Sequence, residues 1–259
     1  MSASTDQNSQ WIDIVFVLDV SKSMNVYDFE YEWQQVSRLQ ASKLAIQEIV
    51  QNNLQNRYWL VVFAWEAVSV SPLTYDRDIF LSFLSSVDYR NLWEQWTNLW
   101  DAYLSAIKRV ESPESSLLVL ISDGWDEEVQ WINNRTQKIQ SSIYGIGTKN
   151  WWEIISWTDV FWRPQYETYN WERVIVWLNE TNLKKLAREV NADYETINDF
   201  NDLDELTQTI ASIETKDIEI GWQESSKSYL RILSLVFWVV FMCFILTPFF
   251  SSRIQQIRH

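Results

Sequence analysis

Short apolar segments that alternate with helical patterns constrain the fold of this chain more than any other feature. Ile12–Asp19, Tyr58–Ala64 and Ser116–Gly124 are nearly continuous apolar runs of strand length. Such runs are typical of parallel strands that are buried on both faces. Helical patterns lie between them, which favours right-handed βαβ units. We therefore predict an α/β fold, a doubly wound and mostly parallel sheet with helices on both faces.

The remaining segments extend this pattern to about residue 215. Residues 149–173 carry no clear period and are predicted to be irregular. Asn179 is a candidate N-cap for the helix that follows it. The predicted helices are Val36–Asn53, Asp76–Val87, Asn98–Val110, Val129–Gln140, Asn179–Val190 and Asn201–Glu214, and the further predicted strands are Ser142–Thr148, a short one within Arg173–Trp177, and Ala192–Ile197.

The C-terminal part of the chain has a different character. Ile232–Phe250 is a run of 19 residues without a charge, bracketed by Arg231 and Arg253. At 1.5 Å per residue such a helix is about 29 Å long, which is enough to cross the hydrocarbon core of a bilayer. The alternative, a buried core helix, is disfavoured because the helix would have no polar face. We predict one transmembrane helix and a single-pass membrane protein.

These features predict the following domain organisation. The polar residues 1–10 have neither a basic nor an apolar region of a signal peptide and are expected to be a flexible N-terminus. Basic residues occur on both sides of the predicted span, so they do not decide which side of the membrane carries the domain. The predicted parts are residues 1–10, an α/β domain over 11–215, a juxtamembrane linker over 216–231, the span over 232–250, and a short basic tail over 251–259.

Composition excludes several classes of function. The formal net charge is −14, which argues against binding to nucleic-acid phosphates. The single histidine is the last residue, His259, so a Ser-His-Asp or Cys-His catalytic site and a histidine-ligated zinc are not expected. The single cysteine, Cys243, precludes an intrachain disulfide.

Polar side chains follow the first predicted strand at regular spacing. Asp19, Ser21 and Ser23 lie just past its carboxyl end, the edge at which ligands bind in open α/β sheets. Alternate residues of an extended turn point the same way, so one carboxylate and two hydroxyls can converge. These hard oxygen donors suit Mg²⁺, Mn²⁺ or Ca²⁺. A lone Asp-x-Ser-x-Ser is also common by chance, and the alternative is a solvated turn.

Two further residues strengthen the metal hypothesis. Asp123 ends another buried strand at the same edge, and Thr97 lies in a loop just before a predicted helix. With these residues the sequence resembles the von Willebrand factor A (VWA) domain, whose metal-ion-dependent adhesion site (MIDAS) reads Asp-x-Ser-x-Ser, then Thr, then Asp. All five positions match, at Asp19, Ser21, Ser23, Thr97 and Asp123.

The resemblance carries expectations about this site. It implies that Ser21, Ser23 and Thr97 provide direct or water-bridged oxygens to the ion, and that Asp19 and Asp123 bind largely through water. A carboxylate of a partner protein would complete the octahedron.

A longer resemblance covers roughly residues 11–250. The segments WIDIVFVLDVSKSM, RYWLVVFAWEAVSVSPLTYD, WEQWTNLWDA and RVIVWLNETNLKKLA look like the bacterial aerotolerance (Bat) group of membrane-anchored VWA proteins. This resemblance implies an envelope-associated complex with a role in stress tolerance. It also implies other VWA or Bat-type proteins and an ATPase system of the AAA+ type as partners.

The tryptophan and glycine counts are unusual. The chain has 17 tryptophans and 4 glycines, whereas about 18 glycines are expected at a typical frequency of about 7%. Members of the resembled family have glycine at the positions of Trp11, Trp59, Trp65, Trp96 and Trp100, and further tryptophans flank strand ends. We infer that UGA codons, which encode glycine in some bacterial lineages, were read as tryptophan. The alternative is a chain that is truly rich in tryptophan.

Three functions remain in competition. The first is a membrane-anchored module that binds a protein partner through Mg²⁺. The second is a structural membrane anchor with a vestigial metal site. The third is a metal-dependent phosphohydrolase, for which the only evident source of a general base is Asp123–Glu128, a segment that also reads as an exposed acidic loop. We expect the first, and not an enzyme.

Overall fold

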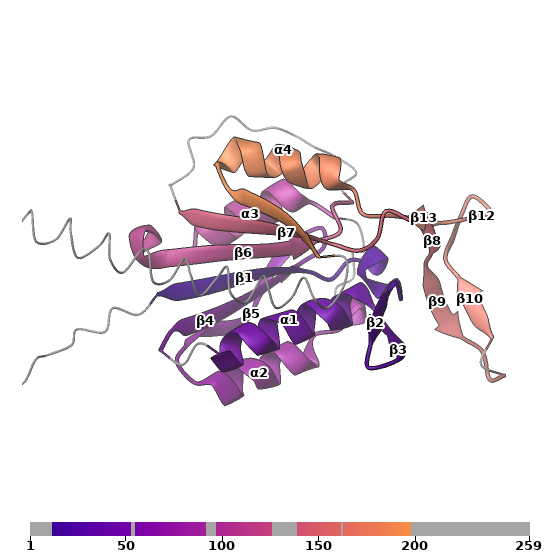
Figure 1. The fold of residues 1–259 in the computed structure, drawn as a ribbon, viewed down its shortest axis with the longest axis horizontal. Coiled ribbons are helices and arrows are strands. Elements are labelled where there is room, and N and C mark those ends of the chain that lie inside the picture. The colour runs from indigo at the N-terminus through magenta and orange to yellow at the C-terminus, as the bar shows by residue number, and fades with distance from the viewer. Residues whose placement is uncertain (1–11, 53–54, 92–96, 126–138, 162, 198–259) are drawn as a thin grey trace, which may run out of the picture. The chain divides into compact units, whose positions relative to one another are not determined.

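The computed structural model describes residues 12–52, 55–91, 97–125, 139–161 and 163–197. A six-stranded sheet in the order β14-β7-β6-β1-β4-β5 forms its centre (Figure 1). Every neighbouring pair is parallel except β4 and β5, which are antiparallel. This arrangement is the predicted α/β fold with a mostly parallel sheet. The strands are β1 (Asp13–Asp19), β4 (Arg57–Phe63), β5 (Ala67–Thr74), β6 (Ser116–Ser122), β7 (Gln140–Ile146) and β14 (Asp193–Ile197).

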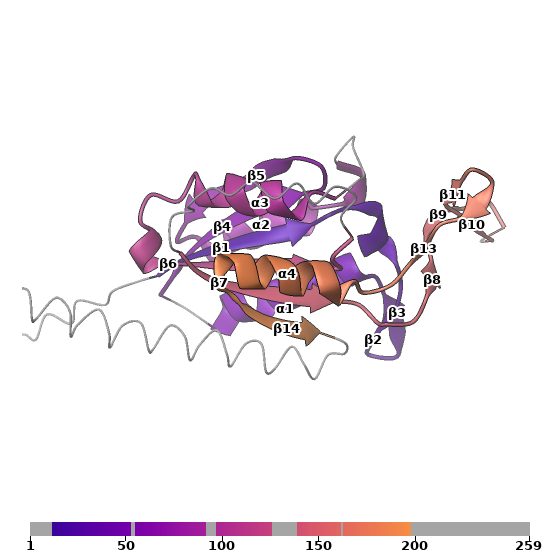
Figure 2. The same cartoon turned by 90° about the horizontal axis from the view of Figure 1, so that it is seen from above.

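Within the described part of the chain, the helices α1 to α4 cover the sheet, as seen from two directions in Figures 1 and 2. Two of them, α1 and α2, contact each other and the strands on one face, and α3 and α4 lie on the other. Their bounds are α1 (Arg38–Asn52), α2 (Arg77–Ser86), α3 (Leu99–Ile107) and α4 (Glu180–Val190), with short 3-10 turns η1 (Lys22–Asn25), η2 (Tyr89–Asn91) and η3 (Pro113–Ser115).

Each buried strand supplies both layers of the core, because successive side chains of a strand point to opposite faces. Along β1, Val15 and Val17 belong to the cluster that includes α3 and α4. Phe16 points the other way, where it stacks on Tyr58 with ring centroids 6.4 Å apart and contacts Phe80 of α2 at 5.9 Å. Burial on both faces explains why these strands read as continuous apolar runs.

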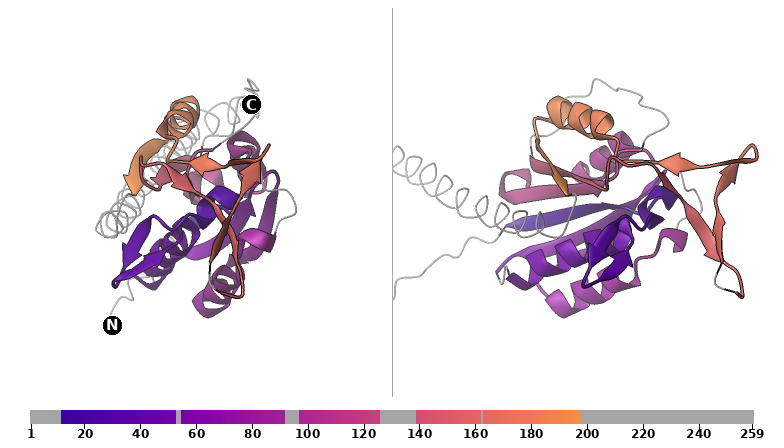
Figure 3. Two further views of the ribbon diagram at one scale, coloured as in Figure 1. Left: turned by 90° about the vertical axis from the view of Figure 1, so that its right-hand side faces the viewer. Right: turned by 45° about the vertical axis from the view of Figure 1, so that its right-hand side comes forward.

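Small two-stranded sheets lie outside the main sheet. A hairpin of β2 (Phe29–Tyr31) and β3 (Gln34–Val36) follows η1. The segment between β7 and α4 forms an extended arm, residues 152–176 except 162, which projects beyond the carboxyl ends of the strands (Figure 3). The prediction that residues 149–173 are irregular was therefore wrong in part. The arm contains β8 (Trp152–Glu153), β9 (Ile155–Thr158), β10 (Pro164–Tyr166), β11 (Thr168–Tyr169), β12 (Glu172–Arg173) and β13 (Ile175–Val176).

One strand was missed and one element boundary differs from the prediction. Strand β5 was not predicted at all. Gln140, expected at the end of a helix, is the first residue of β7, so the strand begins two residues before the predicted Ser142. Asn179 does occupy the N-cap position of α4, but its side chain makes no capping hydrogen bond.

Several predicted segments lie outside the described residues. They are most of the helix predicted from Val129, the helix predicted at Asn201–Glu214, the polar N-terminus, and everything from residue 198 onward, including the linker, the span at Ile232–Phe250 and the basic tail. Among the helices that the structure describes, none has the length and apolar character needed to cross a membrane.

Candidate functional site

The carboxyl ends of β1, β4 and β6 meet at one edge of the sheet, and the predicted site residues gather there. Asp19 is the last residue of β1 and is fully buried. Its Oδ1 accepts a hydrogen bond from the backbone N–H of Ser21 at 2.8 Å, which folds the chain into a tight turn after the strand. The hydroxyls of Ser21 and Ser23 then lie 3.0 Å apart. The local spacing thus brings one carboxylate and two hydroxyls together, as expected.

Asp123 joins this group from the neighbouring strand. It follows β6 directly, is fully buried, and accepts a hydrogen bond from the Ser23 hydroxyl. Ser122, the last residue of β6, ties the turn that carries Asp123 to Asp19, because its hydroxyl donates to Asp19 Oδ2 at 2.6 Å and accepts from the backbone N–H of Gly124 at 3.0 Å. Asp19 and Asp123 therefore belong to one connected network of hydrogen bonds.

Gly124 shapes the turn that carries Asp123. Its φ of +81° lies in the region that favours glycine, and a Cβ there would be 2.3 Å from the backbone oxygen of Asn179. The N–H of Asn179 in turn donates to the Asp123 carbonyl at 2.8 Å. The start of α4 is thereby fixed against the end of β6.

Thr97 comes to the same edge from a third segment. It is 5% exposed and precedes α3, whose N-cap Asn98 accepts a hydrogen bond from Asp101 N at 3.0 Å. The backbone N–H of Asn98 donates to the carbonyl of Ala64, the residue that follows β4, at 3.0 Å. Since β4 is the neighbour of β1, Thr97 lies beside the end of the strand that carries Asp19. No hydrogen bond links its hydroxyl to the other four residues in the described part of the chain.

The two buried carboxylates create an unfavourable concentration of negative charge. Burial and the nearby charge of Asp123 raise the pKa of Asp19 to about 7. Burial also raises the pKa of Asp123, although the positive charge of Arg38 opposes this effect. A cation bound beside these two carboxyl groups would stabilise their ionised forms.

Arg38 is a charged residue of the site that sequence reasoning missed. Its guanidinium is fully buried, and Nη1 donates to Asp123 Oδ2 at 2.8 Å. No local sequence pattern at the first position of α1 indicates that the partner of Arg38 lies 85 positions away. A charged residue at the start of an otherwise half-apolar helix was the only available signal.

The residues present fit a hard divalent cation. Two carboxylates and the hydroxyls of Ser21 and Ser23 are buried, adjacent and all oxygen donors, which is the ligand chemistry that Mg²⁺, Mn²⁺ or Ca²⁺ prefers. The raised pKa of Asp19 indicates a carboxylate whose charge lacks compensation within the protein. Groups of three or more His, Cys, Asp or Glu side chains placed to hold a metal ion are absent from the described residues, so hydroxyls would have to take part in any site here.

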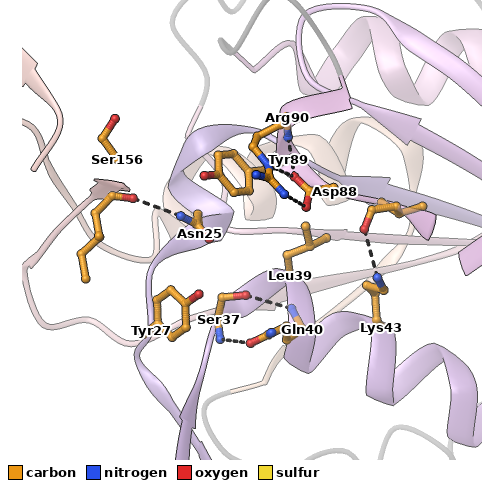
Figure 4. Close-up of a pocket in the computed structure, with 12 residues that line it drawn as sticks. Asn25, Tyr27, Ser37, Leu39, Gln40, Lys43, Asp88, Tyr89, Arg90 and Ser156 are labelled. Atoms are coloured by element: carbon orange, nitrogen blue, oxygen red, sulfur yellow. Dashed lines mark hydrogen bonds and ion pairs between the residues drawn. The ribbon is translucent and has the colours of Figure 1, made fainter. Parts of the chain in front are cut away.

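A concavity lies next to the loop after β1, apart from the proposed ligands. It has a volume of about 340 Å³, and its walls come from η1, the start of α1, η2 and the arm (Figure 4). Polar side chains in its wall are engaged with one another or with backbone: Asn25 donates to the Ile155 carbonyl, Lys43 to the Val87 carbonyl, and Arg90 to Asp88. These interactions hold the wall of the cavity together.

Comparison with known proteins agrees with this architecture. Residues 14–125 match the family model described as von Willebrand factor type A domain. An uncharacterized protein of Borreliella burgdorferi is 28% identical over 258 residues, which span 93% of this chain and 70% of the other.

Two crystal structures have a similar fold. One is the conserved hypothetical protein BatB from Bacteroides thetaiotaomicron, with a TM-score of 0.65. The other is an aerotolerance-related membrane protein from Bacteroides fragilis, bearing multiple mutations to serines, with a TM-score of 0.67. Each is 22% identical to this chain, and the match covers 79% of this chain and 99% of the other. At this identity the likeness establishes the fold. Residues 14–125 are therefore similar to a von Willebrand factor type A domain, and the described part of the chain shares the mostly parallel α/β fold of BatB and of the aerotolerance-related membrane protein.

Proposed function

We propose that this chain is a membrane-anchored VWA module that binds a protein partner through a divalent ion, with Mg²⁺ as the expected physiological metal. The observation that carries the proposal is the convergence of two buried carboxylates, Asp19 and Asp123, with the hydroxyls of Ser21 and Ser23 at one sheet edge. Thr97, buried beside the end of β4, is the fifth proposed ligand. The ion would supply an electrophilic point to which a carboxylate of the partner binds.

The surroundings of the site suit a macromolecular partner. The arm is tied to the loop that carries the serines by an ion pair between Lys22 and Glu167 at 2.9 Å and by the bond from Asn25 to the Ile155 carbonyl. Its outer turn exposes apolar side chains, with Val160 88% and Phe161 73% exposed. A protein that placed a carboxylate on the metal would therefore also contact the arm. Bat-type proteins in an envelope complex, together with an AAA+ ATPase, are the proposed class of partner.

Membrane attachment is the second part of the proposal. It rests on the uncharged run at Ile232–Phe250 and on the likeness in fold to a protein described as an aerotolerance-related membrane protein. Alkaline extraction of membranes from cells that produce the full chain provides the test. The full chain should stay in the membrane pellet, and a chain that ends at residue 215 should be released.

Magnesium itself provides the direct test of the binding function. A ligand that binds only the native state stabilises it by about 2.7 kcal/mol at 100 times its dissociation constant. We therefore expect Mg²⁺ to raise the thermal midpoint of the domain, and EDTA to reverse the rise. Capture of the partner from membranes should follow the same dependence. A midpoint that Mg²⁺, Mn²⁺ and Ca²⁺ all leave unchanged would favour the vestigial site and contradict the proposal.

We further propose that UGA-encoded glycine stands at most of the tryptophan positions in the physiological protein. Two hairpins support this idea. In each, two residues connect the strands with positive φ at both, +46° and +68° at Glu32-Trp33, and +50° and +70° at Asn170-Trp171. These are the angles of a type I′ turn, in which glycine is the preferred second residue. Both indoles make little contact, being 94% and 100% exposed.

Replacement of tryptophan by glycine should change the free energy of unfolding in opposite directions at Trp171, which lies in one of these turns, and at Trp151, which does not. Trp171→Gly should raise the free energy of unfolding by about 1 kcal/mol, since the relief of left-handed strain exceeds the added entropy of the unfolded chain. Trp151→Gly is the control, because Trp151 has no positive φ and its ring lies 6.1 Å from that of Trp177. That change should lower stability. Urea denaturation measures both, and a loss of stability at Trp171→Gly would contradict the strain argument.

The codons decide the recoding directly. UGA should encode positions 33 and 171, and mass spectrometry of the protein from its own cells should find glycine there. UGG at these two positions would reject the proposal and leave the metal site as argued.

A further inference from the structure

A single guanidinium connects the candidate metal site, with its carboxylates Asp19 and Asp123, to a third buried carboxylate. Arg38 donates from Nη1 to Asp123 Oδ2 at 2.8 Å, and from Nη2 and Nε to Asp28 Oδ2 at 2.7 and 3.0 Å. The side chains of all three residues are inaccessible to solvent. Asp28 is not one of the five proposed ligands, and it lies between η1 and the β2–β3 hairpin.

Asp28 is itself fixed from another direction. The backbone N–H and the hydroxyl of Thr148, which follows β7, donate to Asp28 Oδ2 at 3.0 and 3.2 Å. Its Oδ1 is buried and has no hydrogen-bond partner among the described residues. Oδ2 of Asp28 thus accepts all of these hydrogen bonds. Asp28 binds the Nε and Nη2 edge of the Arg38 guanidinium, whereas Asp123 binds Nη1.

The fold also reserves the space that the guanidinium fills. Gly147 has a φ of +127°, and a Cβ at this position would lie 2.7 Å from Arg38 Nε. The backbone N–H of Arg38 donates to the Val26 carbonyl at 3.0 Å, so the first residue of α1 is anchored as well. The loop after β1, the start of α1 and the turn after β7 therefore all meet at one side chain.

This arrangement is a costly way to gain stability. Moving charged groups out of water costs several kcal/mol per ion, and apolar replacements of a buried ion pair are often neutral or stabilising. A planar fork that bonds two carboxylates at once does, however, fix the orientation of both. One oxygen of Asp123 is turned to Arg38, and the carboxylate keeps its remaining hydrogen-bonding capacity for Ser23 and for the backbone N–H of Trp125 at 3.3 Å.

We propose that Arg38 is a positioning residue of the metal site, which holds Asp123 in the orientation that ion binding requires and is itself held by Asp28. The inference rests on the proposed function, since it concerns the same ion. It makes a prediction that electrostatics alone does not make. A positive charge beside the site repels a cation, so its removal would tighten metal binding if charge were the only effect.

Isothermal titration with Mg²⁺ alone separates the two effects. Arg38→Lys keeps the charge but cannot bond both carboxylates in a fixed plane, and Arg38→Gln removes the charge. Positioning predicts weaker binding by both, about 10- to 100-fold, as is typical when the outer partners of metal ligands are lost. Charge alone predicts unchanged binding by Arg38→Lys and tighter binding by Arg38→Gln. Either of these two results would overturn the proposal.

A milder variant keeps the proposal testable if the Arg38 variants do not fold. Thr148→Val keeps the charge and nearly the shape, and removes the hydroxyl bond to Asp28 together with the exposed bond that the hydroxyl accepts from Trp152 Nε1. Trp152→Phe, which removes only the second of these bonds, is the matched control and should leave Mg²⁺ binding unchanged. For Thr148→Val we expect severalfold weaker Mg²⁺ binding with an unchanged circular dichroism spectrum. Unchanged affinity would count against the proposal even if the Arg38 variants do not fold. A merely structural role of the bridge would lower the thermal midpoint without Mg²⁺ and leave the affinity of the folded fraction unaltered.

Mg²⁺ binding by the unmodified domain separates a failure of the proposed function from a failure of the positioning role. If it does not bind Mg²⁺, the proposed function fails. If it binds and Arg38→Lys binds equally well, the function stands and the positioning role is wrong.

Discussion

Asp19→Asn should abolish the stabilisation of the domain by Mg²⁺ and with it the metal-dependent capture of a partner. The change removes one of the two negative charges nearest the proposed ion and keeps the shape of the side chain. Loss of a charged group at the ion should weaken binding by about 100-fold or more, beyond the effect of losing an outer partner. Thermal unfolding with and without Mg²⁺ measures the loss.

The same variant should be more stable than the original domain when no divalent ion is present. A carboxyl whose pKa is raised on folding, here to about 7 from an ordinary value of 3.8, binds its proton more tightly in the native state. Its contribution to stability is therefore lost progressively as the pH rises from about 4 to 7. Asp19→Asn has no such proton to lose, so its advantage without metal should grow over this pH range.

The opposite end of the same strand offers a matched control. Asp13 begins β1, is 6% exposed, and pairs with Arg57 at 2.6 Å, away from the site. Asp13→Asn should destabilise the domain at neutral pH and leave its response to Mg²⁺ intact. Equal responses to Mg²⁺ in Asp19→Asn and Asp13→Asn would show that the ion does not bind at Asp19.

Gly124→Ala should destabilise the domain by about 2–5 kcal/mol, because two costs combine. A residue with a side chain pays about 1–2 kcal/mol for the left-handed backbone at φ +81°, and overpacking adds about 1–3 kcal/mol. The added Cβ would meet the backbone oxygen of Asn179 at 2.3 Å, and that oxygen cannot turn away as a flexible side chain can. Urea denaturation measures the change.

Gly145→Ala is the appropriate comparison. A Cβ at Gly145 would approach Tyr194 Oη at 2.6 Å, which is the far end of a movable side chain, and the backbone of Gly145 is not left-handed. Its cost should be clearly smaller than that of Gly124→Ala. A similar loss of unfolding free energy in the two variants would mean that the start of α4 moves away from the added Cβ more easily than its hydrogen bond to Asp123 indicates.

The central strands were predictable because burial on both faces leaves a continuous apolar run. This holds for β1, β4 and β6, whose predicted bounds agree with the structure within one or two residues. Strand β5 was not predicted because it lies at the edge of the sheet and is therefore only partly buried. Its sequence, AVSVSPLT, alternates valine and serine only over the four residues Val68–Ser71 before a proline follows, so neither a continuous apolar run nor a long alternation marks it.

The hairpins were missed for a different reason. A two-residue turn between strands is normally announced by Asn-Gly or a similar pair. Here the corresponding residues are Glu32-Trp33 and Asn170-Trp171. The strand pairing in the structure is ordinary, and only the turn signal is absent from the sequence.

At the candidate site the sequence revealed the proposed ligands but not their support. Asp19, Ser21 and Ser23 are close in the chain, so their spacing is visible. The bridge from Asp28 through Arg38 to Asp123 joins residues that are distant in the chain, and no periodicity relates them. Contacts of this kind depend on the packing of the whole sheet and become visible only once the fold is known.

The irregular pairing of β5 has a consequence for how other chains can attach. The register with β4 shifts between Tyr58 and Leu60 and again between Leu60 and Val61, and Pro72 has no N–H to donate. An edge that is bulged and interrupted by proline is a poor template for a strand from another chain. This side of the domain is thereby protected from edge-to-edge aggregation, and β-augmentation there is disfavoured as a mode of assembly.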